Sequence, residues 1–421
     1  MVQAAASPHS PMVSPQQLVR DFPQLACAPT VLVAFSGGLD SSVLLHLLVM
    51  ARDAGLLNGQ LAALHVNHGI QDVADSWQRY CQTTCEALAV PLNVQTLALG
   101  ITQGTMESAH NGHVSEGQAR AARYACFAAA LPPDGLLLQG HHQQDQGETL
   151  LFRLLRGTGL KGLGGIPATR SLGNGTILRP LLTMPHSTLE CYAREQGLQW
   201  VEDPSNQDCS YSRNYLRQTV LPVLYARWPD FGARAALTAA HCQEAAALLE
   251  EVALTDLQHV SAPHGQSLEL DKLMQMSPAR RNNVLRHWYH LSVGPEAPIL
   301  NHVRLQALQD TVLAASEAAT PVLRWGEGEF LREARRYRQQ LYLVRPLPEL
   351  PASLAWQHST ALTLPAPLGT LVLEPAEGNQ TLIFRKDEPL EIRFRSGGEQ
   401  VKLPGRPARA LKKLLQESGV P

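Results

Sequence analysis

The chain has 421 residues, of which 44% are hydrophobic and 17% are charged, and its formal net charge at pH 7 is −2. This composition indicates a globular protein of two or three domains, and the lack of any run of about 18 apolar residues excludes a membrane-spanning helix. The seven cysteines contain no Cys-x-x-Cys pair, and the first basic residue is Arg20. We therefore expect neither a structural zinc site nor a signal peptide, and we expect a cytoplasmic location.

The first predicted strand leads into the most informative stretch of the chain. Residues 1–22 are expected to form a disordered leader, and Thr30–Phe35 then form a strand that ends at Ser36-Gly37-Gly38-Leu39-Asp40-Ser41. A helix is predicted over Ser42–Ala54. The glycines allow a ligand to approach the backbone, and the start of the helix supplies N–H groups and the positive end of its dipole. This turn is a predicted phosphate site, and the Asp40 carboxylate beside it predicts Mg²⁺.

Strands and helices continue to alternate after this turn. Further strands are predicted at Leu61–Val66, Leu92–Leu97 and Leu136–Gln139, and further helices at Asp72–Ala89, Ser115–Leu131 and Gln143–Arg156. This alternation predicts a Rossmann-like parallel α/β sheet within a catalytic domain over residues 23–216. Because ligands of such sheets bind at the carboxyl ends of the strands, the phosphate turn and the end of the fourth strand should share one site.

A second cluster of polar residues follows the fourth strand. His141 stands at the strand end, and the next helix carries Asp145 and Glu148 three positions apart on one face. Acidic residues at a helix start also stabilise the helix dipole, which is the alternative role for Glu148. Their expected position beside the phosphate turn favours a catalytic role.

The pattern changes after about residue 216. Arg213, Asn214 and Arg217 follow the segment Glu202-Asp203-Pro204-Ser205-Asn206. Alanine-rich helical periodicity then predicts a helical substrate-binding domain over residues 217–346, and residues 347–421 are Pro-rich and strand-like, as expected for a small C-terminal α/β domain. Residues 385–413 hold nine basic and four acidic residues, including Lys412 and Lys413. This basic segment is a predicted RNA-facing surface.

Together these motifs resemble the tRNA(Ile)-lysidine synthetase family, a branch of the N-type ATP pyrophosphatases, or PP-loop superfamily. The resemblance extends from about Val31 to the end of the chain, and the motif from His141 to Thr149 with Glu202–Asn206 and Arg213-Asn214 makes it specific. It implies a ligase that uses ATP to adenylate O2 of the wobble cytidine in the CAU anticodon of tRNA(Ile). Free L-lysine then attacks C2, and lysidine, AMP and diphosphate result.

The resemblance also implies roles for individual residues. ATP would lie on residues Ser36 to Ser41, with Mg²⁺ between phosphate and Asp40. The residues expected to hold tRNA or nucleotide are Arg120, Arg123, Arg213, Asn214, Arg217, Lys412 and Lys413. The attacking lysine amine has a pKa of about 10.4, so its deprotonation at pH 7 costs about 4.6 kcal/mol. Asp145 is the first candidate for the base, and Glu148 and His141 are the others.

Two departures from the family pattern bear on these expectations. Gln144 stands where the family usually has the first of two aspartates, which puts a metal or lysine role of this position in doubt. Relatives continue for some tens of residues beyond Pro421, so we expect a truncated last domain. A tRNA thiolase and a non-catalytic tRNA-binding relative are the competing interpretations, although a thiolase needs a reactive cysteine. The sequence leaves the oligomeric state open, with a homodimer as one candidate.

Overall fold

The structure is a computed structural model that divides into two compact units, Met1–Ala247 and Leu248–Pro421. The residues that it describes are 14–67, 74–97, 116–202, 208–263, 265, 267–294, 297–316, 319, 321–347, 349–356, 361–366, 368–372, 390–395, 397–402 and 407–417. The division falls inside the long helix α11 (Phe231–Val260). Within the described residues, no helix has the length and apolar character needed to cross a bilayer.

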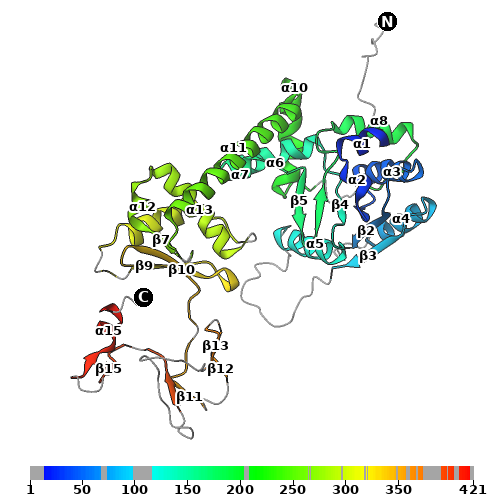
Figure 1. The fold of residues 1–421 in the computed structure, drawn as a ribbon. Helices are drawn as coiled ribbons and strands as arrows, with labels where there is room; N and C mark the ends of the chain where they lie inside the picture. Colours follow the sequence, from blue (N-terminus) through cyan, green and yellow to red (C-terminus); the bar gives the residue numbers. More distant parts are fainter. Residues whose placement is uncertain are drawn as a thin grey trace. The chain divides into compact units, whose positions relative to one another are not determined.

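The first unit is built on a six-stranded sheet with the strand order β3-β2-β1-β4-β6-β5. Figure 1 labels β2, β3, β4 and β5 of this sheet. The strands are β1 (Thr30–Ala34), β2 (Gln60–Asn67), β3 (Leu92–Thr96), β4 (Leu136–Leu138), β5 (Thr169–Leu172) and β6 (Gly175–Leu178). Neighbouring strands are parallel except for β5, which pairs antiparallel with β6. The predicted parallel sheet is therefore confirmed, and the β5–β6 hairpin adds two strands that the sequence did not predict.

Helices cover both faces of this sheet, and the β1 sequence shows why. Val31 and Val33 belong to the larger core cluster, whereas Leu32 belongs to a second cluster with Phe127. Successive strand residues point to opposite faces, so an unbroken apolar strand must be covered on both. The helices of this unit are α1 (Pro15–Asp21), α2 (Gln24–Cys27), α3 (Leu39–Asp53), α4 (Ala74–Ala87), α5 (Glu116–Ala130), α6 (Gln143–Leu155), α7 (Leu160–Leu163), α8 (His186–Glu195), α9 (Ser212–Tyr215), the π-helical η2 (Leu216–Val220) and α10 (Leu221–Arg227).

Helix α1 corrects the expectation of a disordered leader over residues 1–22. Ser14 caps this helix by accepting a hydrogen bond from Gln17 N, and Pro15 occupies its first turn. Leu18 is only 2% exposed and lies in the core cluster of the sheet. Residues 14–21 are therefore part of the folded unit, while residues 1–13 lie outside the described residues.

The second unit contains the predicted helices together with an antiparallel sheet. The sheet has the order β7-β10-β9-β8, formed by β7 (Ser267–Glu269), β10 (Gln340–Val344), β9 (Arg332–Tyr337) and β8 (Val322–Trp325). The helices include α12 (Leu270–Gln275), α13 (Pro278–Val293), α14 (His302–Leu308), the π-helical η3 (Gln309–Leu313) and the short 3-10 helix η4 (Gly328–Phe330).

This sheet was not predicted from the sequence, because β9 is rich in charged residues. Glu333 is only 1% exposed, and it accepts hydrogen bonds from Arg324 Nε at 2.9 Å and from Arg335 Nε at 2.8 Å. Arg324 lies opposite Glu333 on the neighbouring strand β8. Two guanidinium groups thus neutralise a buried carboxylate, and this allows a strand with charged residues to pack against the core.

The last part of the chain consists of short strand pairs. They are β11 (Ser353–Trp356) with β14 (Leu390–Arg393), β12 (Leu362–Thr363) with β13 (Thr370–Leu371), and β15 (Gln400–Val401) with β16 (Arg409–Ala410), followed by helix α15 (Leu411–Glu417).

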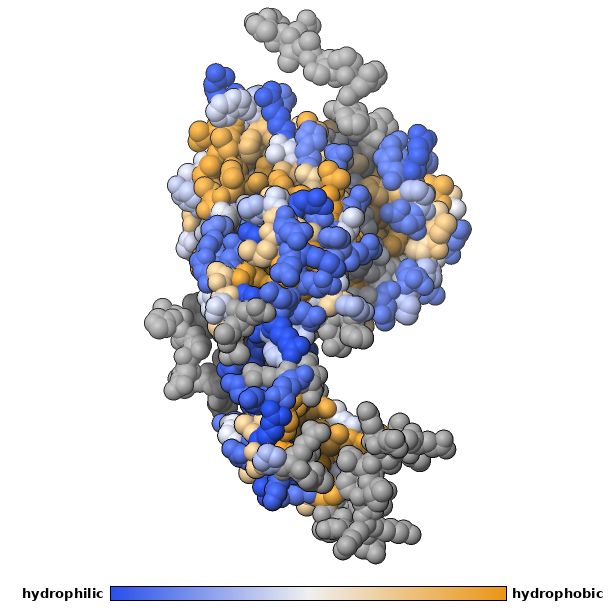
Figure 2. Space-filling view, turned by 60° about the vertical axis from the view of Figure 1, so that its left-hand side comes forward, coloured by the Kyte–Doolittle hydropathy of each residue, from blue (hydrophilic) through white to orange (hydrophobic). Residues whose placement is uncertain are grey.

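Figure 2 shows orange apolar areas among polar ones on the visible surface. The exposed apolar side chains include Leu155, Val223, Ile299 and Val303.

Candidate active site

The turn between β1 and α3 leaves little room for a side chain at Gly37. This residue has φ +83°, and a Cβ atom there would lie 3.2 Å from both Cys81 Sγ and the Tyr80 ring. Gly38 is the N-cap of α3, and Leu39 is the first helical residue. The turn can therefore offer backbone N–H groups to a ligand without a side chain in the way, as expected of a phosphate site.

Two serine hydroxyls hold this turn together. Ser41 Oγ donates to the carbonyl of Gly38 at 3.0 Å and accepts from Ser36 N at 3.3 Å. The Ser36 and Ser41 hydroxyl oxygens are 3.1 Å apart. Because both serines are used in this way, the predicted ATP-binding residues from Ser36 to Ser41 form one preorganised turn.

Gly37→Ala should destabilise the protein by about 1–3 kcal/mol and weaken ATP binding, because a non-glycine residue at positive φ is strained. The contacts with Tyr80 and Cys81 add to that strain. Thermal unfolding and ATP titration measure the two effects. Gly55→Ala is the matched control, since Gly55 has φ +68° but nothing within 4 Å of the added Cβ. Equal losses of stability in both variants, with ATP binding retained in both, would refute the tight fit around Gly37.

The start of α6 carries the acidic motif, His141 to Glu148, and it packs against this turn. A Cβ atom at Gly140 would lie 3.0 Å from the carbonyl carbon and oxygen of Asp40, so the two corners of the sheet are in close contact. His142 is the N-cap of α6, and its Nδ1 accepts from Gln144 N at 3.2 Å. Asp145 Oδ2 accepts from His142 N at 3.0 Å. This capping box fixes both His142 and Asp145.

A network of histidines and carboxylates joins the two corners. His142 Nε2 lies 3.7 Å from Asp40 Oδ2 and 3.5 Å from Asp145 Oδ2. The first residue of α8 completes the network, because His186 Nε2 lies 3.6 Å from Asp40 Oδ1 and His186 Nδ1 lies 3.3 Å from Glu190 Oε1. Sequence reasoning gave no role to His142, His186 or Glu190. The fold, and no local pattern, brings α8 to this place.

Two arginines form ion pairs with the carboxylates of the acidic motif. Arg217 Nη2 lies 2.8 Å from Glu148 Oε2 and 3.2 Å from Asp145 Oδ1, and Arg213 Nε lies 3.7 Å from Glu148 Oε1. Arg213 lies on α9 and Arg217 on η2, and both side chains lie close to Glu148. Asn214 differs, because its side-chain amide donates to the carbonyl of Asp208 at 2.9 Å.

One of the two predicted arginines of α5, Arg120, lies beside the ring of Tyr124. Arg120 Nη2 donates to Tyr124 Oη at 3.1 Å, and its guanidinium carbon lies 4.9 Å from the ring centroid. Arg179 donates to the same hydroxyl at 3.3 Å. Arg123 is half-buried on α5.

The environments of Asp40 and Asp145 shift the pKa values of the two carboxyl groups in opposite directions. Burial, with a smaller contribution from Asp145, raises the pKa of Asp40 to about 7, although Arg217 opposes the change. Burial also acts to raise the pKa of Asp145, but His142, His141, the His142 N–H and Arg217 outweigh it and hold the pKa below its usual value. Paired carboxylates with opposite shifts are typical of catalytic sites.

The pKa values of the neighbouring groups His141 and Glu148 are also shifted in opposite directions. Burial lowers the pKa of His141 to about 4, so its imidazole is neutral at pH 7. His141 Nδ1 is buried and has no hydrogen-bond partner within the described part of the chain. Burial raises the pKa of Glu148 despite the opposing charge of Arg217. The site therefore holds an ionised Asp145 beside an uncharged imidazole.

Three family models match the chain in succession. They are the PP-loop domain over residues 13–224, the TilS substrate binding domain over 268–342 and the TilS substrate C-terminal domain over 390–421. A tRNA(Ile)-lysidine synthase of Pseudomonas fluorescens is 42% identical over 420 residues, which cover 97% of this chain and 88% of that protein. The enzyme of the same name from Coxiella burnetii is 38% identical, with coverages of 97% and 87%. This chain belongs to the tRNA(Ile)-lysidine synthase family.

The residues of this family member fit a magnesium ion at the phosphate turn. Asp40 Oδ1 is buried and accepts no hydrogen bond within the described residues. An oxygen in that state suits a hard cation that keeps its other ligands as water and phosphate. Asp40 would then hold the ion that neutralises the phosphate charge.

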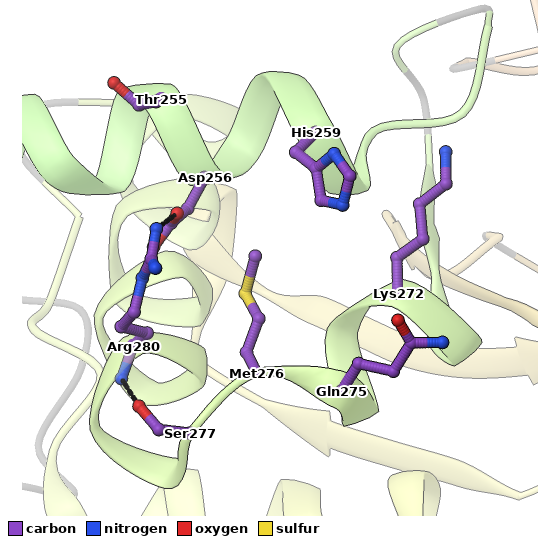
Figure 3. A pocket seen from close by; sticks show the side chains of 8 residues that line it. All are labelled: Thr255, Asp256, His259, Lys272, Gln275, Met276, Ser277 and Arg280. Carbon is purple, nitrogen blue, oxygen red and sulfur yellow. Dashed lines mark hydrogen bonds and ion pairs between the residues drawn. The ribbon is translucent and has the colours of Figure 1, made fainter.

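A separate cavity of about 640 Å³ lies in the second unit of this lysidine synthase family member. Its lining, shown in Figure 3, is Thr255, Asp256, His259, Lys272, Gln275, Met276, Ser277 and Arg280. Arg280 pairs with the buried Asp256, and Lys272 pairs with Glu269 at 2.9 Å. The residues of the phosphate turn and of the acidic motif do not line this cavity.

Proposed function

We propose that this chain ligates free L-lysine to C2 of the wobble cytidine in the CAU anticodon of tRNA(Ile). ATP activates the cytidine, and lysidine, AMP and diphosphate are the products. The observation that carries the proposal is the close packing of Gly140 on Asp40, which places the phosphate turn beside Asp145 and His142. The residues proposed to bind ATP and the residues proposed to transfer protons would therefore act at a single site.

Activation must precede attack in this reaction. The carbonyl carbon of cytosine is a poor electrophile until its oxygen becomes a leaving group, and transfer of AMP to O2 achieves this. The backbone N–H groups around Gly38 and the start of α3 would hold the phosphates. Mg²⁺ bound by Asp40 would supply charge neutralisation for the departing diphosphate.

Attack by lysine needs a group that receives the ammonium proton. The side chain of Asp145 is 18% exposed, whereas that of Glu148 is 5% exposed and contacts Arg217 and Arg213. Asp145 is therefore the more accessible of the two carboxylates, and we propose it as the base. Glu148 would instead hold the two arginines that enclose the site.

Gln144, at the position of the usual aspartate, has a structural role. Its side-chain Oε1 accepts a hydrogen bond from His186 N at 2.8 Å. Gln144 thus holds the first residue of α8, and we do not assign it to lysine or metal. A neutral amide also adds no further negative charge beside Asp40 and Asp145.

Binding of the tRNA would involve surfaces that the comparisons match to substrate-binding domains. We propose Arg120, Arg123, Arg213 and Arg217 for the nucleotide near the catalytic site, and Lys412 and Lys413 for another part of the tRNA. We further propose a cytoplasmic location.

One assay tests the proposed function. Purified protein is incubated with ATP, tRNA(Ile) and radiolabelled lysine, and label in the tRNA and AMP release are measured. Both are expected, in equal amounts. Sulfur transfer to the tRNA would indicate a thiolase, and tRNA binding without AMP release would indicate a non-catalytic relative.

Replacing Lys412 and Lys413 by glutamine should weaken tRNA binding and reduce its salt dependence. Both side chains are exposed on α15. Each phosphate contact contributes about 0.7 to 0.9 to the slope of log affinity against log salt, so the slope should fall by about 1–2. Arg20→Gln, at an exposed position on α1, is the control and should leave the slope unchanged. An unaltered slope in the double variant would exclude these lysines from the interface.

A further inference from the structure

His186 presents an acceptor nitrogen to Asp40. Its Nδ1 lies 3.3 Å from Glu190 Oε1, so the tautomer that carries its proton on Nδ1 places that proton beside a carboxylate. In the neutral ring, Nε2 then holds a lone pair. That atom lies 3.6 Å from Asp40 Oδ1, a buried oxygen without a hydrogen-bond partner among the described residues. Two acceptors thus face each other across a gap.

Facing acceptors repel unless a positive charge lies between them. We propose that Asp40 Oδ1 and His186 Nε2 together ligate a divalent cation, so that the cation at the phosphate turn has an imidazole ligand as well as a carboxylate. This inference rests on the proposed function, because it names a second ligand for the ion that Asp40 would hold. Glu190 then orients the ligating ring, an arrangement common for histidines that bind metals.

His142 belongs to this site as a neighbour of the cation rather than a ligand. The atoms of Asp40, His142 and His186 that could bind a metal all lie within 4.8 Å of one another. However, His142 Nδ1 accepts a hydrogen bond from Gln144 N, so the proton of the neutral ring is on Nε2. A protonated nitrogen cannot bind a metal. His142 Nε2 instead lies 3.7 Å from Asp40 Oδ2 and 3.5 Å from Asp145 Oδ2, so its proton faces the two carboxylates.

The distance between the two proposed ligand atoms suits such an ion after a small closure. In the octahedral geometry of Mg²⁺ and Mn²⁺, two neighbouring ligand atoms about 2.1 Å from the ion lie about 3.0 Å apart, and the observed separation is 3.6 Å. A nitrogen ligand also changes which ion is favoured. Mg²⁺ prefers oxygen ligands, whereas Mn²⁺ accepts both carboxylate and imidazole. The site should therefore bind Mn²⁺ more tightly than Mg²⁺ in the absence of ATP.

Electron paramagnetic resonance of Mn²⁺ bound to the full-length protein without ATP tests this directly. Loss of the free-ion signal gives the affinity, and electron spin echo modulation detects a coordinated ¹⁴N. We expect ¹⁴N modulation in the unaltered protein. His186→Gln should abolish it and weaken Mn²⁺ binding at least about tenfold, and Glu190→Gln should weaken binding about tenfold while the ¹⁴N signal persists.

Glu195→Gln, at the other end of α8, is the matched control and should change neither quantity. Near-ultraviolet circular dichroism verifies that the His186→Gln variant is folded. Missing ¹⁴N modulation in the unaltered protein, or unchanged Mn²⁺ affinity in His186→Gln, would overturn the inference and would indicate a protonated His186 bridging two carboxylates. Lysine incorporation with Mg²⁺ and ATP, measured in parallel, shows whether the proposed function stands when the inference fails.

Discussion

Asp40→Asn should abolish AMP formation and at the same time raise the melting temperature of the protein at pH 8. The loss of activity follows from the position of Asp40 in the first turn of α3, beside the predicted phosphate site. An amide has no negative charge with which to hold a divalent cation. The gain in stability follows because Asp40 is a charged group in an environment that disfavours charge.

The sign of the stability change can be derived from the pKa of Asp40. The folded-state pKa of Asp40 is about 7, against 3.8 for an unperturbed aspartate, chiefly because of burial. The folded protein thus binds this proton more tightly than the unfolded chain does. The stability that protonated Asp40 contributes is fully present below about pH 4 and is lost as the pH rises through 7. The difference in melting temperature between Asp40→Asn and the unaltered protein should therefore be largest at pH 8 and shrink toward pH 4.

Asp53→Asn provides the control on the same helix. The Asp53 side chain is 60% exposed and pairs with Arg52 at 2.9 Å. This variant should keep full AMP formation, and its melting temperature should stay close to that of the unaltered protein at both pH 4 and pH 8. A lower melting temperature for Asp40→Asn at pH 8, or normal AMP formation in that variant, would exclude the assigned burial or the assigned role of Asp40.

The strands and helices around the phosphate turn were predictable because local signals agree there. The run Val31–Phe35 is apolar on both faces, two glycines follow it, and the apolar pattern of α3 begins at once. Each signal predicts the same strand, turn and helix. The first four strands and their helices were therefore found from the sequence, with bounds that differ from the structure by a few residues.

The remaining part of the site depends on contacts between distant residues. His186 follows Pro185 at the start of an amphipathic helix, which is an ordinary pattern for a surface helix. Its approach to Asp40 results from the β5–β6 hairpin and from the hydrogen bond that His186 N donates to Gln144. The buried Glu333 is a similar case, because its neutralising arginines become neighbours only in the folded sheet. Periodicity cannot predict pairs of this kind.

Asp145→Asn should slow the attack of lysine by about 10²- to 10⁴-fold, the usual contribution of a general base, while slowing adenylation much less. The replacement is conservative, because the asparagine oxygen can still accept the hydrogen bond from His142 N that caps α6. What it removes is the group that would receive the lysine proton. In single-turnover experiments, diphosphate release should then precede lysidine formation, and adenylated tRNA should accumulate.

The pH dependence of lysine attack in the unaltered protein provides a second reading of the same assignment. Because the pKa of Asp145 lies below its usual value, this carboxylate is ionised throughout the neutral range. The rate should rise with pH above 7, as more of the lysine amine is deprotonated. Glu148→Gln is the comparison, since loss of its ion pair with Arg217 should lower stability without separating the two steps. Equal slowing of both steps in Asp145→Asn would instead indicate that Asp145 supports the metal or the nucleotide.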